Sequence, residues 1–151
     1  MSDQEIVIRL LMAVLLGGLI GLEREAAGRA AGLRTHVLVC LGSALIMMTS
    51  IHIFEIYRGL ADVDPSRIAA QVVSGIGFLG AGTIIRYGHN VKGLTTAASL
   101  WVIAAVGLAV GSGFMKAAVF TTFLVLLGLI VFGKIVHRFF PDLEVPGKDD
   151  I

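Results

Sequence analysis

Five long apolar runs constrain this chain more than any other feature of its sequence. Each run has about 17–23 residues with very few charges, and a helix needs about 20 apolar residues to cross the hydrocarbon core of a bilayer. No run alternates apolar and polar residues as a strand of a membrane barrel does. Helices are therefore expected, because in lipid every backbone polar group must be satisfied within the protein. The predicted spans are residues 6–22, 37–54, 68–85, 94–110 and 114–136.

The composition supports a membrane protein and excludes several other classes. Apolar residues make up 56% of the 151 residues and charged residues 15%, against about 45–50% and about 25% in soluble domains. Disorder, a basic nucleic-acid-binding domain and a freely soluble enzyme are therefore not expected. The predicted fold class is all-α. It comprises one polytopic transmembrane domain over residues 1–140 and a short polar cytoplasmic tail over residues 141–151.

Lysine and arginine are distributed unevenly between the two predicted faces of the membrane. Eight lie in the loops after the first and third spans and at the C-terminal end, whereas three lie on the other side. Because cytoplasmic loops carry the excess of basic residues, the N-terminus is predicted outside and the C-terminus in the cytoplasm. The chain begins with acidic residues, which favours a retained first span over a cleaved signal peptide. Arg9 is expected to extend its guanidinium to the outer membrane surface.

Glycine pairs four residues apart occur in the first and fourth spans. Gly17 and Gly21 form one pair, and Gly107 and Gly111 form the other. This spacing lets two helix backbones approach closely in lipid, where apolar burial gives no drive for association. Both pairs are therefore predicted to be helix-packing faces. The single cysteine, Cys40, lies in an apolar run and is predicted to be a small buried side chain.

The third span contains a concentration of glycine. Gly75, Gly77, Gly80 and Gly82 fall within eight residues, and each costs a helix about 1 kcal/mol relative to alanine. The formal G-x-G-x-x-G is not interpreted as a dinucleotide site, because no β-α-β pattern surrounds it and no acidic residue follows to bind the ribose. Two interpretations stay open: a thin helix face against which neighbours pack, or a locally unwound helix whose carbonyls line a cavity.

Charged residues gather at the inner end of the first span. Glu23, Arg24 and Glu25 follow it directly, and Arg34 and His36 come shortly afterwards. One interpretation is an interfacial collar that satisfies the positive-inside rule. The sharper interpretation is an ion-paired gate or a docking surface for a partner. In that case Arg34 is the expected partner of Glu23, because polar groups near the hydrocarbon are costly unless they are paired.

The start of the fourth span is polar as well. Thr95 or Thr96 is expected to cap this helix, and Trp101 is expected to pack between helices. The four histidines are scattered, without metal-ligand spacing to cysteine or aspartate. The serines within the spans have no evident base nearby in the sequence. Neither a catalytic site nor a metal site is predicted.

Four motifs in order resemble the N-terminal membrane domain of the MgtC/SapB/YhiD family. They are GGLIGLERE at 17–25, GLRTH at 32–36, GIGFLGAG at 75–82 and VKGLTTAASLW at 91–101, within a match over about residues 5–138. The resemblance implies a multi-pass protein of the bacterial inner membrane, associated with adaptation to low magnesium and, in pathogens, with survival inside host cells. It implies regulation of other membrane proteins, such as ATP synthase, although the family is often labelled as magnesium transport.

The candidate functional residues are the charged, hydroxyl and glycine positions of these motifs. They are Glu23, Arg24, Glu25, Arg34, Thr35, His36, Gly75, Gly77, Gly80, Gly82, Lys92, Thr95 and Thr96. Many family members continue into a soluble ACT-like domain. The present chain ends at Ile151, so we expect it to lack that domain and the functions that the domain carries.

The predicted function is a non-enzymatic membrane regulator. It is expected to contact other membrane proteins or a second copy of itself within the lipid bilayer, with no nucleic-acid partner. The alternative is a transporter or channel for magnesium or another small ion along the glycine-rich third span. Magnesium prefers oxygen ligands, commonly carboxylates, and none lies inside a predicted span. No cofactor is therefore expected, and glycine carbonyls would have to serve a transported ion. A third hypothesis is a membrane core that needs a separately encoded soluble partner.

Overall fold

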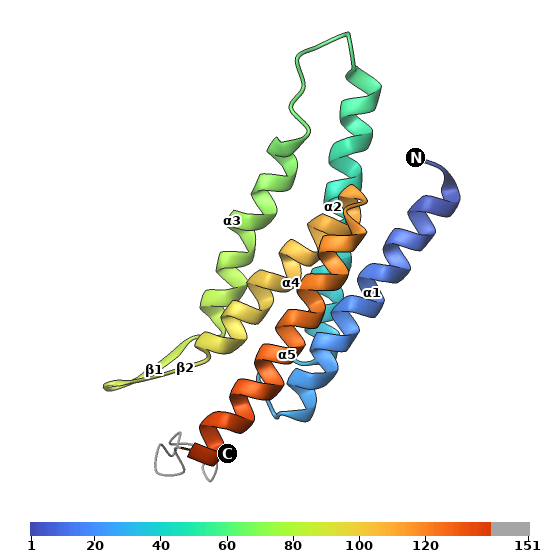
Figure 1. Cartoon of the computed structure of the whole chain (residues 1–151). Helices are drawn as coiled ribbons and strands as arrows, with labels where there is room; N and C mark the ends of the chain where they lie inside the picture. The colour runs from blue at the N-terminus through green and yellow to red at the C-terminus, as the bar shows by residue number, and fades with distance from the viewer. Residues whose placement is uncertain (140–151) are drawn as a thin grey trace.

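Five helices and one short hairpin make up the computed structural model, which describes residues 1–139, with side chains up to residue 133 (Figure 1). The helices are α1 (Asp3–Ala26), α2 (Leu33–Tyr57), α3 (Ser66–Gly82), α4 (Leu94–Ser112) and α5 (Met115–Phe139), and the strands are β1 (Ile85–Tyr87) and β2 (Asn90–Lys92). The helices run alternately up and down, so the N-terminus and the end of α5 lie at opposite ends of the bundle (Figure 1). The predicted helical architecture is confirmed. The predicted tail over residues 141–151 lies outside the described residues.

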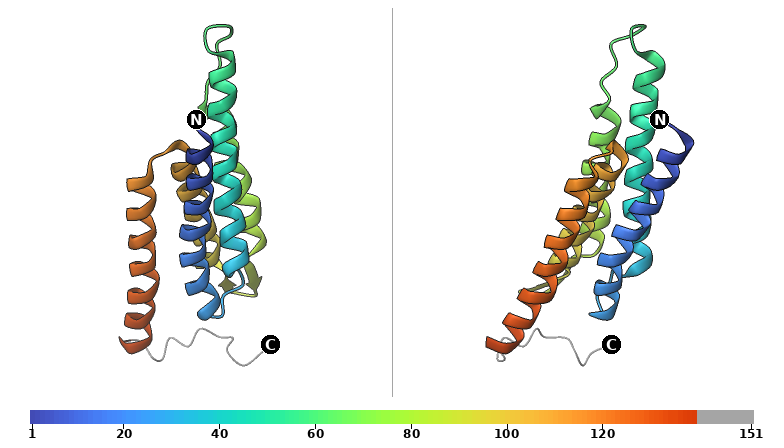
Figure 2. Two further views of the ribbon diagram at one scale, coloured as in Figure 1. Left: turned by 90° about the vertical axis from the view of Figure 1, so that its right-hand side faces the viewer. Right: turned by 45° about the vertical axis from the view of Figure 1, so that its right-hand side comes forward.

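Four of the described helices are long and apolar enough to cross a membrane. They are α1, α2, α4 and the Met115–Gly133 part of α5. The third predicted span corresponds to α3, which has only 17 residues and is not among the four. A crossing by α3 therefore stays a prediction, although the helix runs beside α2 along the bundle (Figure 2).

The most buried helix is α4, which contacts the other four helices. α2 contacts α1, α3 and α4, whereas α5 packs at one side against α4 and α1 (Figure 2). The main core consists of small and branched apolar side chains from four helices. These are Ala13, Leu16, Ile20, Cys40, Ala44, Ile103, Val106, Val110 and Ala118. Cys40 is buried, as predicted. The small side chains indicate that the helices associate by close backbone approach rather than by interlocking of large residues.

Both glycine pairs face α2, one from α1 and the other from α4. A Cβ atom at Gly17 would lie 2.9 Å from the Cβ of Cys40, and one at Gly21 would lie 2.7 Å from the Cα of Leu33. A Cβ at Gly107 would overlap the carbonyl oxygen of Cys40, and one at Gly111 would overlap the carbonyl oxygen of Ala44. No larger residue fits at these positions without a movement of the helix backbone.

Arg9 connects the first turns of α1 to the last turn of α4. Its Nη1 donates to the carbonyl oxygen of Gly111 at 2.7 Å. The last carbonyls of a helix have no partner within the helix, and a cation near them also interacts favourably with the helix dipole. The guanidinium is half-buried at this end of the bundle, and its expected place at the outer membrane surface stays a prediction.

The start of α3 is fixed by polar contacts. The Asp64 carboxylate accepts hydrogen bonds from the backbone N–H and the hydroxyl of Ser66, at 2.8 and 2.7 Å. These bonds favour the charged carboxylate and so lower the pKa of Asp64. From α2, the Ser50 hydroxyl donates to the carbonyl oxygen of Pro65. The loop between the two helices is thus tied to both of them.

A β-hairpin that the sequence pattern did not predict joins α3 to α4. Ile85 pairs with Lys92 and Tyr87 with Asn90, in antiparallel register. The two-residue loop begins at Gly88, whose φ of +57° favours glycine. A two-residue loop with glycine first is a known hairpin signal. Strands of three residues are too short to show an alternating pattern in the sequence. The predicted third span, residues 68–85, therefore continues past Gly82, where α3 ends.

The glycine contacts with α2 predict a position-specific effect of adding one methyl group. We expect Gly107→Ala to lower the free energy of unfolding in detergent by about 1–3 kcal/mol, because the new Cβ overpacks the contact with Cys40. Circular dichroism during unfolding in a graded mixture of mild and denaturing detergents measures this.

Gly77→Ala is the matched control, since a Cβ at Gly77 meets nothing within 4 Å and alanine favours a helix over glycine. For Gly77→Ala we expect the free energy of unfolding to be unchanged or raised. Equal destabilisation by the two variants would contradict backbone packing at Gly107.

Candidate functional site

The charged residues after the first span do not form the pair expected from the sequence. Arg24 is 3% exposed, and its Nη2 donates to Oε1 of the adjacent Glu23 at 2.7 Å, while its Nε donates to the other oxygen. The predicted pairing of Glu23 with Arg34 is wrong. Leu33 and Val37 face α1, which leaves Arg34 exposed on the outer surface of α2, without an ion pair among the described residues.

Glu25 satisfies the first turn of α2. Its Oε2 accepts the backbone N–H of Leu33 at 2.7 Å. The N-cap of α2 is Gly32, which has no side chain to cap the helix, so a carboxylate from α1 does so instead. The next residue in the GLRTH motif with a hydroxyl, Thr35, is half-buried.

His36 lies in the interior, between α2 and α4. Its side chain is fully buried. Nδ1 lies 2.9 Å from the carbonyl oxygen of Gly32, and Nε2 lies 3.0 Å from Oγ of Ser99 on α4. The Ser99 hydroxyl also lies 2.8 Å from the carbonyl oxygen of Thr96. The sequence predicts His36 as a candidate in the charged group at the inner end of the first span, and the structure buries it against α4. Ser99 is not among the candidates predicted from the sequence.

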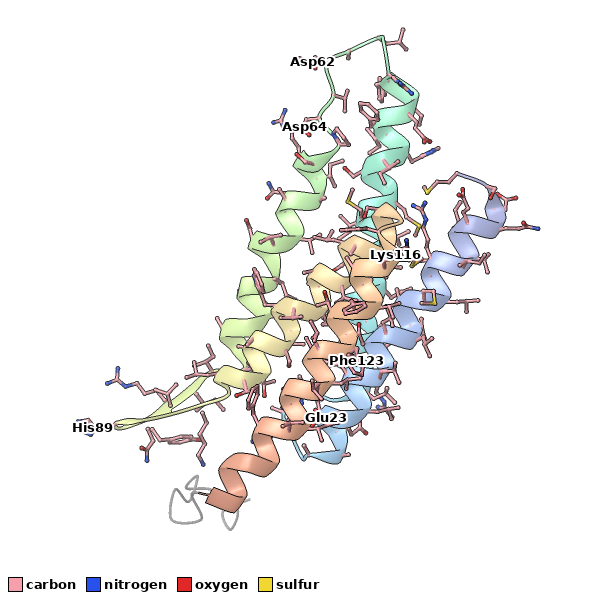
Figure 3. All side chains as sticks on the ribbon, viewed as in Figure 1. Glu23, Asp62, Asp64, His89, Lys116 and Phe123 are labelled. Carbon is pink, nitrogen blue, oxygen red and sulfur yellow. The ribbon has the colours of Figure 1, made fainter. Side chains whose placement is uncertain are left out.

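Two sets of contacts make up what we call the polar junction: Glu23 with Arg24, and His36 with Ser99 and Thr96. It lies where α1 ends and where α2 and α4 begin. Figure 3 shows Glu23 and the hairpin tip at His89 toward this end of the bundle, and Asp62 and Asp64 at the other end. The signal that could have revealed Ser99 is its spacing of three residues from Thr96, which places both on one helix face.

The other candidates at the start of α4 have different roles from those expected. Gly93, with φ of +90°, is the N-cap, and no side chain caps this helix. The expected capping by Thr95 or Thr96 is therefore wrong: Thr95 is exposed and Thr96 is buried. Lys92 is exposed on β2. Trp101 is 53% exposed rather than packed between helices, because it lies on the outer face of α4.

The glycine-rich segment is a continuous helix, so the interpretation as an unwound stretch is not supported. Gly80 packs against α4, where a Cβ would lie 3.6 Å from the Cβ of Ala97. A Cβ at Gly75, Gly77 or Gly82 would meet nothing within 4 Å. Most of this thin face is thus uncovered within the described chain.

An apolar groove lies between α2 and α3, and we call it the α2–α3 groove. Its volume is about 530 Å³. Its walls carry no charged side chain, and its polar side chains are Ser43 and Gln71. Gly42 on α2 and Gly75 on α3 leave open space in the two walls of the groove. A Cβ atom added at either position would have no other atom within 4 Å. The remaining lining residues are Leu38, Val39, Ile46, Ile68, Val72, Ile76 and Leu79.

The carboxylates at the inner end of α1 contact groups of the protein. Across them, no group of three or more His, Cys, Asp or Glu lies close enough together to hold a metal ion. Glu23 is engaged by Arg24 and Glu25 by the start of α2. Both carboxylates are thus engaged by groups of the protein itself.

The buried pair predicts that the two arginines near the inner end differ in importance. Arg24→Ala should lower the free energy of unfolding by roughly 3–5 kcal/mol, because it leaves Glu23 partly buried without its partner. Arg34→Ala, at an exposed position, should change it by less than about 0.5 kcal/mol. Unfolding in mixed detergents followed by circular dichroism measures both, and similar losses would contradict the assigned pairing.

Comparison with known proteins agrees with the motifs. The MgtC family profile matches residues 10–138. The chain is 48% identical over 136 residues to YhiD of Escherichia coli (strain K12), whose name calls it a candidate magnesium transporter, covering 89% of this chain and 63% of YhiD. It is 46% identical over 132 residues to Protein MgtC of Salmonella typhimurium (strain LT2), covering 87% of this chain and 54% of that protein.

A further relative is Protein MgtC of Brucella abortus (strain 2308), 50% identical over 120 residues, covering 79% of this chain and 48% of that protein. The chain thus spans about half to two thirds of the length of these relatives. No solved structure matches it. With a family match over most of its length and four helices able to cross a membrane, the chain is a multi-pass membrane protein that belongs to the MgtC family.

Proposed function

We propose that this protein is a non-enzymatic regulator in the bacterial inner membrane, which acts by contact with other membrane proteins during adaptation to low magnesium. The observation that carries the proposal is the α2–α3 groove, an apolar recess of about 530 Å³ on the side of the bundle. The occupant we propose is a transmembrane helix of a partner protein.

The walls of the groove favour a helix over an ion. They carry no carboxylate and no other charged group, whereas a magnesium ion takes near-octahedral oxygen ligands and commonly keeps its waters. The low positions at Gly42 and Gly75 allow a second backbone to approach closely, which is how helices associate in lipid.

The walls also favour a helix over a lipid chain. Gln71 is exposed and lines the groove. A side-chain amide that faces hydrocarbon is costly unless it forms a hydrogen bond. A partner helix can offer a hydroxyl, an amide or a backbone carbonyl to this side chain, whereas an acyl chain cannot.

The proposed topology has five crossings, with the N-terminus outside and the C-terminus in the cytoplasm. The chain leaves α2 at one end of the bundle and enters α4 at the other (Figure 1), so α3 returns it across. The 17 residues of α3, which include Arg67 and Gln71, lie at the short end of the range for a span. Arg29, Arg34, Arg86 and Lys92 then lie on the cytoplasmic side, as the positive-inside rule favours.

The alternative is transport of magnesium or another small ion along α3, which the name of the YhiD relative supports. Purified protein in liposomes that enclose a magnesium-sensitive dye tests it. We expect no magnesium entry above that of protein-free liposomes, because α3 is a continuous helix whose backbone carbonyls are already hydrogen-bonded. Entry that depends on folded protein and on Gly75 would favour the transporter instead.

The groove proposal predicts site-specific crosslinking to another membrane protein. A photo-crosslinking amino acid at Leu38, in the groove, should give a discrete adduct in cells grown at low magnesium. The same amino acid at Leu11, exposed on α1 outside the groove, should not. Mass spectrometry of the crosslinked peptide should place the adduct in a transmembrane helix.

Gly75→Leu should fill the groove and suppress the Leu38 adduct. Gly77→Leu is its matched control, because both glycines are exposed on α3 without neighbours, but only Gly75 lines the groove. An adduct to a second copy of this chain would show that the groove binds another copy of the same protein instead of a different membrane protein. Equal adducts in all variants would overturn the proposal.

A further inference from the structure

The hairpin of β1 and β2 stands apart from the helix bundle, and no described part of the chain packs over it. All six strand residues are exposed. Figure 1 shows the hairpin projecting outward from the point where α3 ends and α4 begins, and Figure 3 shows its tip at His89 away from the helices. Its apolar side chains include Ile85, Tyr87 and Val91, each 46–65% exposed. An isolated two-stranded hairpin is marginally stable in water at best, so these side chains call for a covering surface.

The base of the hairpin is fixed to the helices on both sides. Gly93, with φ of +90°, passes so close to Thr83 that an added Cβ would overlap the carbonyl oxygen of that residue. The Thr83 hydroxyl donates to the carbonyl oxygen of Gly80, in the last turn of α3, at 2.8 Å. The next helix, α4, begins directly at Leu94 and is long and apolar enough to cross a membrane. The hairpin is therefore held at the level where a membrane span begins.

Two of the three cross-strand pairs in the hairpin join an apolar residue to a basic one. Ile85 pairs with Lys92, and Arg86 pairs with Val91. Paired residues lie on the same face of a hairpin, so each face carries both an apolar and a basic side chain. Neither bulk water nor hydrocarbon suits such a face. The headgroup layer of a membrane suits it, because tyrosine is enriched there and because basic side chains lay their stems along apolar surface while the charge reaches the phosphates.

The positive charge of the hairpin is not neutralised within the described chain. Nε of Arg86 donates to the carbonyl oxygen of Gly88 at 3.0 Å, which holds the guanidinium beside the turn, and its Nη groups have no acceptor among the described residues. Lys92 forms no ion pair there either. Glu23 and Glu25 are already engaged within the protein. The other described carboxylates lie toward the opposite end of the bundle (Figure 3).

We propose that the hairpin lies on the membrane surface and binds the headgroups of anionic phospholipids. Arg86 and Lys92 contact the phosphates, and the guanidinium can do so with two parallel N–H groups. Ile85, Tyr87 and Val91 lie against the glycerol region and the upper acyl chains. A soluble phosphate compound would meet the same two charges but would leave the three apolar side chains in water. The inference rests on the membrane location of the chain and not on the α2–α3 groove or its occupant.

Lipid quenching of a tryptophan in the hairpin tests the proposal. Trp101→Phe removes the single tryptophan of the chain, and Tyr87→Trp places one in β1. The protein is studied in bilayers of phosphatidylcholine with a minor fraction of phosphatidylglycerol. A small amount of one lipid or the other carries a nitroxide high on its acyl chain. We expect both labelled lipids to quench, and labelled phosphatidylglycerol to quench about two- to fivefold more, since one basic residue near an anionic surface contributes about fivefold.

Two results with this protein would overturn the proposal. In one, neither labelled lipid quenches and aqueous iodide quenches as it does a free tryptophan peptide, so the hairpin lies in water, as a site for a soluble partner would. In the other, the two labelled lipids quench equally, so the hairpin does not select anionic headgroups. Inorganic phosphate, added at constant ionic strength, should leave the preference unchanged. Loss of the preference would assign the two charges to a soluble phosphate compound instead.

Glutamine variants separate the hairpin from the general charge of the protein. Arg86→Gln combined with Lys92→Gln should bring the ratio of quenching by the two lipids toward one. Arg58→Gln combined with Arg67→Gln is the matched control, since both arginines are exposed at the other end of the bundle, and it should leave the ratio unchanged. Arg86→Lys combined with Lys92→Arg keeps both charges and should keep the preference. Equal ratios in the two glutamine variants, with helix content confirmed by circular dichroism, would overturn the role of the hairpin.

Discussion

Backbone contact between α2 and its neighbours α1 and α4 is the interaction on which the rest of the structure depends. Lipid chains are as apolar as leucine, so burial of large side chains gives helices no reason to associate in a membrane. Four glycines solve this by removing side chains where the backbones meet, at Cys40 and Ala44 among other positions. The same contact sets the position of α2 along the axis of the bundle. It thereby brings His36 level with Ser99 on α4.

Ionisable side chains near the helix ends form hydrogen bonds with backbone groups as well as with one another. Glu25 accepts the first N–H of α2, and Arg9 donates to the carbonyl oxygen of Gly111 near the end of α4. Arg24 and Glu23 satisfy each other. Among the described residues, no buried side-chain nitrogen or oxygen lacks a hydrogen-bond partner. Charged side chains thus complete the hydrogen bonding of helix ends in this bundle.

The sequence was sufficient for the helices and for the family, because apolar length and ordered motifs are local properties that read directly along the chain. The partner of Glu23 was not predictable. Whether Arg34 reaches it depends on how α2 is rotated about its own axis, and the contacts of Gly17 and Gly21 with α2 decide that rotation. The same applies to Trp101 and to the threonines of α4, since the face that a helix buries is weakly marked when all faces are apolar. The hairpin was missed because its strands are too short for a pattern.

The bond from Arg9 to Gly111 joins residues that are 102 positions apart, and this has a consequence for biogenesis. A ribosome delivers the first helix to the membrane long before the fourth exists. During that interval the guanidinium has no carbonyl to receive its hydrogens, and its lowest-energy place is among lipid headgroups and water. The carbonyl oxygen of Gly111 becomes available only with α4, so this hydrogen bond between the first and fourth helices forms late in assembly of the bundle.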